Sequence, residues 1–222
     1  MPKTRGRALL MAWTDVLEEY EAEFNRWYDD EHMLRLAAVP GFISGARYRA
    51  LRGGPKYLAM YELEEHTVLR TAAFLDEVRF KPSARRTKVS PSTIGRNFLL
   101  NGYRQIFPIK INPADDTHEP APYLQMGRMD IAASMEDEFN DWYNTAFIPG
   151  FLKVPGVLRA RRYAAVEAEP KYLTVYEFAS PDVPDTPEWS AARVGNPWNL
   201  RMRPHLKLDE GSPAVFERIW PA

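Results

Sequence analysis

The chain has 222 residues, 45% of them hydrophobic and 27% charged, with a net charge of −1, which is typical of a globular protein of one or two domains with an apolar core. Because 29 basic residues nearly balance 30 acidic ones and cysteine is absent, the composition argues against a nucleic-acid-binding surface and excludes disulfides, thiolate metal sites and cysteine nucleophiles. No apolar run approaches the roughly 20 residues that span a bilayer, so we expect a cytoplasmic protein with no membrane or nucleic-acid partner.

The first half of the chain alternates between strand-like and helix-like patterns. Short apolar runs bounded by charged or turn residues predict strands, and apolar residues that recur every three or four positions predict helices. Residues 39–41 (VPG) end the first helix, because proline cannot continue a helix and glycine adopts turn conformations. Residues 52–55 (RGGP) are typical of a hairpin turn. The expected elements are strands at 8–16, 42–51, 56–63 and 98–109, helices at 17–38 and 67–78, and a surface loop at 81–95.

The second half of the chain repeats the first. Residues 8–63 and 123–178 align without a gap at a constant offset of 115, with 21 identities in 56 positions. Chance would supply only a handful of identities. We therefore predict an N-terminal unit at 1–111, a polar, proline-rich linker at 112–122, and a C-terminal unit at 123–222 that is a degenerate copy of the first.

The order strand, helix, strand, strand, helix, strand defines a ferredoxin-like unit. A four-stranded sheet with both helices on one face leaves its other face bare, and a bare apolar face needs a partner. Two similar units can cover each other with two-fold symmetry. The sequence therefore predicts an α+β fold in which two tandem ferredoxin-like units form one intramolecular barrel, and a homodimer of this fused body stays possible.

A resemblance to a known superfamily rests on three segments of the first half: FNxWYxxxH at 24–32, VPGF at 39–42 and RY at 47–48. This pattern resembles the EthD-like branch of the dimeric α+β barrel superfamily, and the resemblance extends over both halves. It implies a pocket between the helices of one unit and that unit's own sheet. Members include cofactor-free monooxygenases, polyketide cyclases and dehydratases, lactone isomerases, decarboxylases and haem enzymes.

The chain departs from that pattern at two points. Leu34 stands where the pattern has a proline in the first half. The second half keeps this proline as Pro149 but has Phe147 in place of His32. Only the first half could then carry histidine chemistry.

His32 is the candidate catalytic residue. It shares one helix face with Phe24 and Tyr28, and Asp29 precedes it by three residues, near enough to orient its ring or raise its pKa. A histidine beside a carboxylate and an aromatic wall suits general acid–base catalysis near neutral pH. We predict that His32, Tyr28 and Asp29 are catalytic, although a half-exposed helix histidine among charges is the simpler interpretation.

The predicted substrate-binding residues are aromatic side chains of the same unit and one arginine that could hold a carboxylate or phenolate. Most of them recur in the second half, which equally favours core packing; Trp13 is the exception, because Arg128 replaces it there. An ion pair of the arginine with Glu62 is an alternative to a binding role. These residues are Trp13, Phe24, Trp27, Arg47, Tyr48 and Tyr61.

The sequence predicts neither a metal site nor a cofactor. His66, His118 and His205 are scattered and show no metal-ligand spacing. Phosphate-binding glycine loops, serine elbows and dinucleotide fingerprints are missing from the sequence. A haem ligand is not indicated, although haem binding stays open.

These observations predict a cofactor-independent acid–base enzyme, a lyase, dehydratase or isomerase acting on a small hydrophobic or aromatic carbonyl compound of a catabolic or polyketide-type pathway. His32 would move a proton while Tyr28 and a nearby arginine or tyrosine stabilise the developing oxyanion. One alternative is a cofactor-free monooxygenase of the same superfamily. The other is a non-catalytic protein that binds a hydrophobic ligand, with the second half as structural filler.

Overall fold

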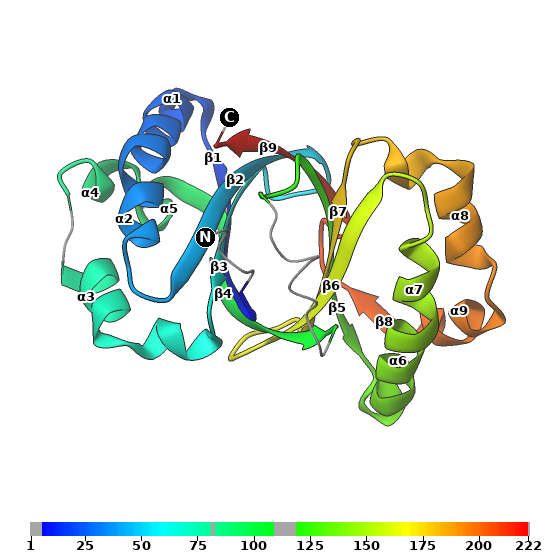
Figure 1. The fold of residues 1–222 in the computed structure, drawn as a ribbon. Helices are drawn as coiled ribbons and strands as arrows, with labels where there is room; N and C mark the ends of the chain where they lie inside the picture. The colour runs from blue at the N-terminus through cyan, green and yellow to red at the C-terminus, as the bar shows by residue number, and fades with distance from the viewer. Residues whose placement is uncertain (1–5, 81–82, 109–118, 222) are drawn as a thin grey trace.

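The computed structural model describes residues 6–80, 83–108 and 119–221 (Figure 1). In these ranges eight antiparallel strands close into a barrel in the order β7-β6-β4-β1-β3-β2-β9-β5, and β5 pairs back to β7. The helices pack outside the barrel in two groups, on opposite sides (Figure 1). The strands are β1 Ala8–Val16, β2 Phe42–Arg52, β3 Tyr57–Leu63, β4 Gly95–Phe107, β5 Tyr123–Ile131, β6 Val157–Ala165, β7 Tyr172–Phe178, β8 Leu206–Leu208 and β9 Ala214–Trp220. The α-helices are α1 Glu18–Trp27, α2 Met33–Ala37, α3 Ala72–Phe80, α4 Arg86–Val89, α5 Pro91–Ile94, α6 Glu136–Trp142, α7 Ile148–Phe151, α8 Pro187–Val194 and α9 Pro197–Met202.

The barrel consists of two ferredoxin-like sheets joined edge to edge. The first unit contributes β4-β1-β3-β2 and the second contributes β9-β5-β7-β6, with β2–β9 and β4–β6 as the seams. The predicted fold class is therefore confirmed. Most of the predicted linker at 112–122 lies outside the described residues.

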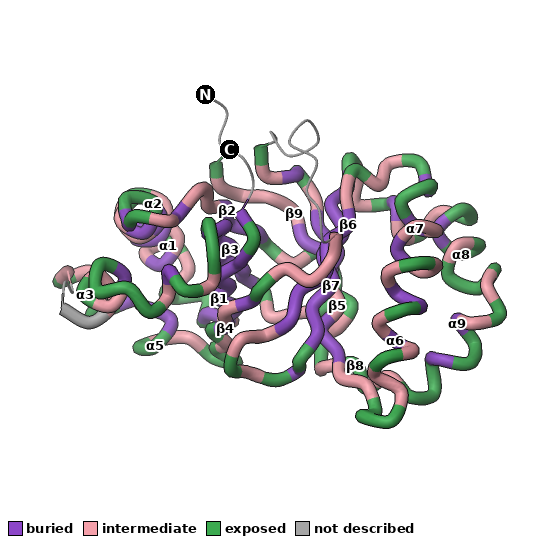
Figure 2. The backbone as a smooth tube through the Cα atoms, turned by 60° about the horizontal axis from the view of Figure 1, so that its bottom comes forward, coloured by how far each residue is buried: buried purple, intermediate pink, exposed green. Residues whose placement is uncertain are grey.

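Strand alternation gives the sheet two different faces. One face fills the barrel with large apolar side chains from both units, and the other packs against the helices. Figure 2 shows the buried residues concentrated along the barrel strands, while the outer sides of the helices are exposed. The barrel core includes Leu9, Met11, Trp13, Tyr48, Leu58, Met60, Leu124, Met126, Leu173, Val175 and Phe216.

A buried ion cluster also joins the two units. Arg161 of β6 donates to Glu62 of β3 at 2.8 Å and to Glu177 of β7 at 3.1 Å. The alternative that Arg47 pairs with Glu62 is wrong. Arg47 lies opposite Ala59 in the β2–β3 register, so Glu62, three residues after Ala59, points to the other face of the sheet.

The long first helix of each unit contains a π-helical turn. In the first unit Tyr28–His32 forms this turn between α1 and α2, and in the second Tyr143–Phe147 forms it between α6 and α7. The predicted helix at 17–38 is therefore interrupted. Since Leu34 stands where the second unit has Pro149, the missing N–H of a proline is not what causes the turn in the first unit. Turns of this kind often lie at functional sites because they redirect side chains.

Three further features differ from the sequence prediction. The predicted loop at 81–95 contains α4 and α5 in its described part. The helix predicted at 67–78 begins as a 3₁₀ turn at His66–Arg70 and continues as α3 from Ala72. The short strand β8 was not predicted; it pairs with the second half of β5.

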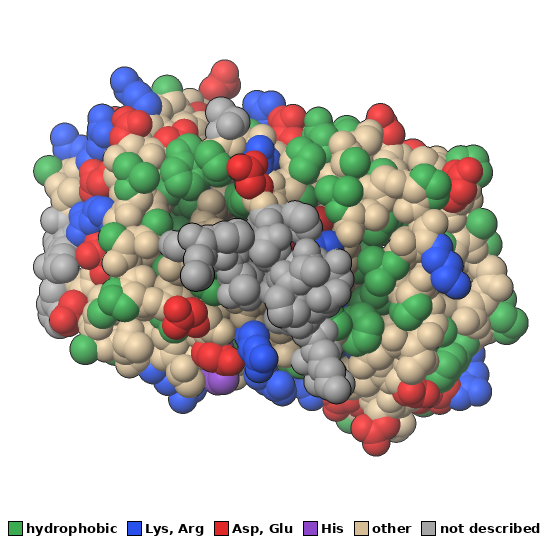
Figure 3. All heavy atoms as spheres, in the orientation of Figure 1, with side chains coloured by type: hydrophobic (Ala, Val, Ile, Leu, Met, Phe, Trp, Pro, Cys, Tyr) green, Lys and Arg blue, Asp and Glu red, His purple; other side chains and the backbone are tan. Residues whose placement is uncertain are grey.

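No helix within the described ranges is long and apolar enough to cross a membrane. Figure 3 shows acidic and basic side chains interspersed over one face, in keeping with the near-zero net charge.

Candidate active site

The predicted site in the first unit is a packed aromatic cluster around His32. The imidazole stacks on Trp27 with ring centroids 4.5 Å apart and meets the edge of Tyr28 at 4.9 Å. The Arg47 guanidinium lies 4.5 Å from the centroid of the Tyr28 ring. Phe24, Trp27, Tyr28 and Tyr61 all belong to the same core between helix and sheet. The structure thus brings these predicted residues together, although most of them are fully buried.

The electrostatics of His32 differ from the expectation. Burial lowers the pKa of His32 to about 3, with further contributions from the positive charges of Arg86, Arg35 and Arg47. Asp29 does not counteract this, because its carboxylate accepts a hydrogen bond from Arg47 at 2.5 Å. The expectation that Asp29 raises the histidine pKa is therefore wrong. A base this weak is poorly matched to proton transfer near neutral pH.

Two predicted residues lie on the other side of the sheet. Trp13 and Tyr48 point into the barrel, where Trp13 stacks under Arg128 at 4.8 Å and Tyr48 donates to the Ala121 carbonyl. They cannot share a pocket with His32, so this part of the predicted site is wrong. The alternation of side chains along a strand already predicts part of this separation. Arg47 and Tyr48 are adjacent on one strand, so their side chains must point to opposite faces of the sheet.

A partly open cavity with an aromatic wall lies mainly in the second unit. Its volume is about 480 Å³, and it is bounded by β5, β7, the π-helical turn, α7 and α8. His32 does not line it. The resemblance implied a pocket of this kind between helices and sheet, but the predicted site residues all lie in the first unit. Its aromatic wall consists of Trp142, Tyr143, Phe147, Phe151, Tyr176 and Trp189.

The strand floor of the cavity differs from the equivalent floor in the first unit. Gln125, Gly127 and Thr174 line the cavity. The residues 115 positions earlier are Leu10, Ala12 and Ala59, which are buried in the apolar core of the first unit. The second unit thus has a glycine and two polar side chains where the first has apolar ones. This difference was visible in the alignment of the two halves and is the signal that sequence reasoning missed.

Two buried tyrosines belong to the cavity wall. Tyr143 donates to the Met129 sulfur at 3.4 Å and shares a hydrogen bond with Thr174; burial raises its pKa to about 12, against the opposing effect of Arg162. Tyr176 is also buried, which raises its pKa well above the ordinary value, and its hydroxyl has no hydrogen-bond partner among the described residues. An unpartnered buried hydroxyl is costly and favours a ligand atom that accepts its proton.

A buried arginine stands behind these tyrosines. The guanidinium of Arg162 lies 4.5 Å from the Tyr143 ring and donates to the side-chain oxygens of Asn144 at 2.7 Å and Asn140 at 3.0 Å. It pairs with no carboxylate in the described part of the chain, and burial lowers its pKa to about 10. It remains charged near neutral pH and gives the cavity a positive potential. In the first unit the equivalent arginine is neutralised by Asp29.

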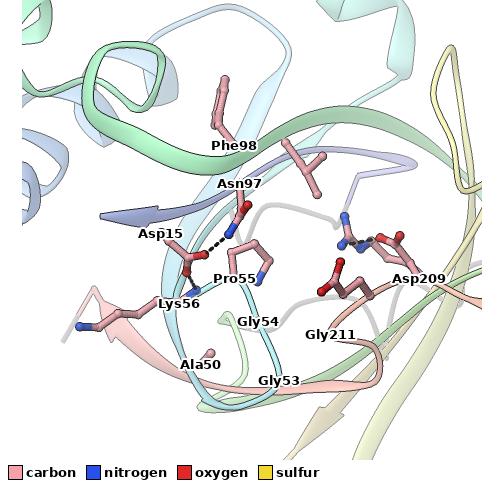
Figure 4. Close-up of a pocket in the computed structure, with 13 residues that line it drawn as sticks. Asp15, Ala50, Gly53, Gly54, Pro55, Lys56, Asn97, Phe98, Asp209 and Gly211 are labelled. Carbon is pink, nitrogen blue, oxygen red and sulfur yellow. Dashed lines mark hydrogen bonds and ion pairs between the residues drawn. The ribbon is translucent and has the colours of Figure 1, made fainter. Parts of the chain in front are cut away.

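A second hollow of about 680 Å³ opens at one end of the barrel (Figure 4). Arg128 pairs there with Asp209 at 2.5 Å, and Asp15 accepts from Asn97 and from the backbone N–H of Lys56. The surrounding residues are mostly charged, polar or glycine, so this hollow lacks the aromatic wall of the first cavity. Within the described ranges no group of three or more histidine, aspartate or glutamate side chains could hold a metal ion. His118, one of the scattered histidines, lies outside those ranges.

Comparisons with known proteins support the fold. No protein-family model matches the chain, and neither does any curated protein sequence. Among solved structures, it is similar to TA0507, a protein assigned as a chlorite dismutase, with a TM-score of 0.61, 15% identity and coverage of 96% of this chain and 95% of that one. An anthrone oxidase-like protein gives a TM-score of 0.60 and 15% identity, covering 96% and 90%. A haem-binding protein from Thermus thermophilus gives 0.56 and 11%, covering 96% and 91%. The three agree with the dimeric α+β barrel fold of the chain and show nothing beyond the fold.

One of these proteins binds haem, so the fit of haem to the cavity of this chain depends on the residues that line it. Haem iron is held by histidine, cysteine, methionine or tyrosine. No histidine lines the cavity, and its one methionine, Met129, already accepts a hydrogen bond from Tyr143. Tyr143 and Tyr176 are neutral phenols at ordinary pH because burial raises both pKa values. The lining residues therefore do not fit haem.

Proposed function

We propose that this protein is an enzyme whose active site is the cavity of the second unit, and that it oxidises a small aromatic ketone or phenol with dioxygen. The observation that carries the proposal is an aromatic cavity of about 480 Å³ whose wall includes Tyr176, a tyrosine with a buried hydroxyl that has no hydrogen-bond partner among the described residues. Such a donor fits a carbonyl or phenolate oxygen of a flat ligand whose ring lies against the tryptophan and phenylalanine side chains.

The lining residues favour a substrate that supplies its own acidity. The tyrosines of the cavity have raised pKa values, and the one lining carboxylate, Asp185, is paired with Arg52 at the mouth. A general base with a pKa near neutral is therefore lacking among them. An enolisable ketone or a phenol releases its proton to solvent more easily than an unactivated C–H bond does. The positive potential of Arg162 and the Tyr176 hydroxyl would stabilise the resulting anion.

The reaction balances with dioxygen as the only co-reactant. The substrate anion reduces dioxygen, and a carbon–oxygen bond forms at the carbon next to the aromatic ring to give a peroxide anion, which takes up a proton. Loss of water from the peroxide breaks the O–O bond and leaves a carbonyl. In total the CH₂ group of the ketone and O₂ become C=O and H₂O. In a phenol the carbon–oxygen bond forms instead at the ring C–H opposite the hydroxyl, and the phenol and O₂ become a quinone and H₂O.

The predicted histidine-dependent lyase or isomerase has less support. His32 lies outside the cavity, and its pKa of about 3 leaves it a weak base. The similarity to an anthrone oxidase-like protein agrees with the oxidation reading, because anthrones are flat ketones with an acidic CH₂ group.

The test is to incubate the protein with anthrone in air-saturated buffer and to measure dioxygen uptake and quinone formation. The proposal predicts one dioxygen consumed for each quinone formed, at a rate proportional to protein concentration and well above the uncatalysed rate. Saturable binding of anthrone without turnover would contradict the proposed oxidation and support the alternative of a non-catalytic binding protein. If anthrone is neither bound nor oxidised, that result contradicts the proposal.

A further inference from the structure

The mouth of the cavity is lined by charged side chains that the proposed oxidation does not use. They are Arg52, Asp185, Arg193 and Arg203. Asp185 is occupied, because both of its oxygens accept hydrogen bonds from Arg52, at 2.6 and 2.8 Å. Arg193 and Arg203 form no ion pair with any carboxylate in the described part of the chain. The mouth therefore carries two arginines whose charges are not balanced.

We propose that the substrate of this cavity carries a carboxylate, which Arg193 and Arg203 bind at the mouth while the aromatic ring lies inside. This inference rests on the proposed function and narrows its substrate class to aromatic acids. Guanidinium groups bind carboxylates through paired, charge-assisted hydrogen bonds, and two of them can hold one carboxylate from both sides.

The two arginines come from different elements that meet at the same opening. Arg193 lies in the last turn of α8, four residues after Trp189, so it continues the helix face that forms the aromatic wall. Arg203 begins the 3₁₀ turn Arg203–His205 that follows α9. A ligand with its ring against Trp189 would extend its outer end between them.

The first unit provides an internal comparison. Thr71 and Thr186 both accept the hydrogen bond that begins the next helix, so the offset of 115 extends to α3 and α8. At this offset the partner of Arg193 is Val78, which packs against the apolar core of the first unit. The positive charge of Arg193 is thus found in the unit that has the cavity, and not at the matching helix position of the other unit.

Positive charge also continues inward from the mouth. Arg162 lies behind Tyr143 without a carboxylate partner among the described residues, so the inner end of the cavity would favour the ionised ketone or phenol. The outer arginines would favour the carboxylate. A ligand with an anionic group at each end of a flat ring system matches both features.

The experiment compares two matched probes, 2-naphthol and 6-hydroxy-2-naphthoate, by isothermal titration calorimetry. Variants Arg193→Gln, Arg203→Gln and the double variant are measured beside the control Arg201→Gln. Arg201 is an exposed arginine of α9 that pairs with Glu138 and does not line the cavity. Calorimetry at two salt concentrations separates charge from packing, because the attraction at an exposed mouth weakens with salt.

The wild-type protein should bind the naphthoate about tenfold more tightly than naphthol. Each cavity-mouth variant should weaken naphthoate binding by roughly fivefold, a typical effect of a partly exposed charge, and leave naphthol binding unchanged. The Arg201→Gln variant should bind both as the wild type does. Equal binding of the two probes, or naphthoate binding that the double variant does not weaken, would overturn the inference and leave the proposed function standing. Failure of both probes to bind the wild type would overturn the inference and the proposed function together.

Discussion

The two units of the barrel share a framework and differ in what fills it. Both have the same strand order, a π-helical turn in the long helix and a strand arginine stacked on the tyrosine that begins this turn. In the first unit apolar strand side chains and His32 complete a packed core. In the second, glycine and polar side chains at the matching positions border a cavity. The two units have the same backbone arrangement. The size and polarity of a few strand side chains thus determine whether the space between helices and sheet is filled or forms a cavity.

Charge follows the same division. The stacked arginine of the first unit is Arg47, which is neutralised by Asp29 and has a purely structural environment. Its counterpart Arg162 meets Asn144 instead and keeps an unbalanced charge beside the cavity. Burying an unpaired charge costs stability, so its retention next to a binding site points to a role in holding an anion.

Closing the cavity should have the largest effect. In Gly127→Leu the new side chain would enter the cavity, since an added Cβ meets only the end of the flexible Met129 side chain. Binding of 2-naphthol, followed by calorimetry, should weaken at least about 100-fold, because the ring and the leucine compete for the same space. The matched variant Ala12→Leu overpacks the first unit's core and should cost about 1–3 kcal/mol of stability without affecting binding. Similar loss of binding in both variants would contradict the comparison.

His32 should make the first unit sensitive to acid. Its pKa is about 3 in the folded protein against 6.5 in the unfolded chain, so the unfolded state binds more protons below pH 6.5. Stability should therefore fall as the pH decreases, by about 2 kcal/mol between pH 6.5 and pH 5 from this residue alone.

The second unit supplies the control variant, His32→Phe, because phenylalanine occupies the equivalent position there. Urea unfolding of the wild type and the variant at both pH values gives the difference. The variant should lack this part of the pH dependence and keep its oxidation activity. Loss of turnover in a folded His32→Phe protein would instead support the predicted histidine mechanism.

Exchanging the arginine partners should have the smallest effect. Asn144→Asp gives Arg162 the carboxylate that Arg47 has, and should stabilise the fold by about 1 kcal/mol while weakening the stabilisation of a bound anion. The reciprocal variant Asp29→Asn should destabilise the fold and leave ligand binding unchanged. Thermal unfolding together with naphtholate binding at alkaline pH separates the two effects. A stabilised Asn144→Asp protein with unchanged anion binding would exclude a role for Arg162 in the site.

The sequence was sufficient for the fold because strand and helix periods and the duplicated pattern are local or repeated features. It also identified the cluster of His32, Tyr28 and Arg47. The histidine pKa could not be predicted, because Arg86 approaches from a segment more than 50 residues away and burial depends on packing. The cavity was not predicted, because it depends on positions where the second unit has glycine or a different side chain from the first unit. Gly127 and Thr174 nevertheless differ from their first-unit partners in the alignment, so the comparison of halves held the clue.

The most direct test of the central claim compares Tyr176→Phe with Tyr61→Phe. The two tyrosines occupy equivalent positions, and both have a buried hydroxyl without a hydrogen-bond partner among the described residues. If the second unit is the active site, removal of the Tyr176 hydroxyl should lower the rate of anthrone-dependent dioxygen uptake by about tenfold, since one hydrogen bond to a charged oxygen is lost. The Tyr61→Phe protein should react at the wild-type rate. A Tyr176→Phe protein with full activity, or a larger loss in Tyr61→Phe, would contradict the account.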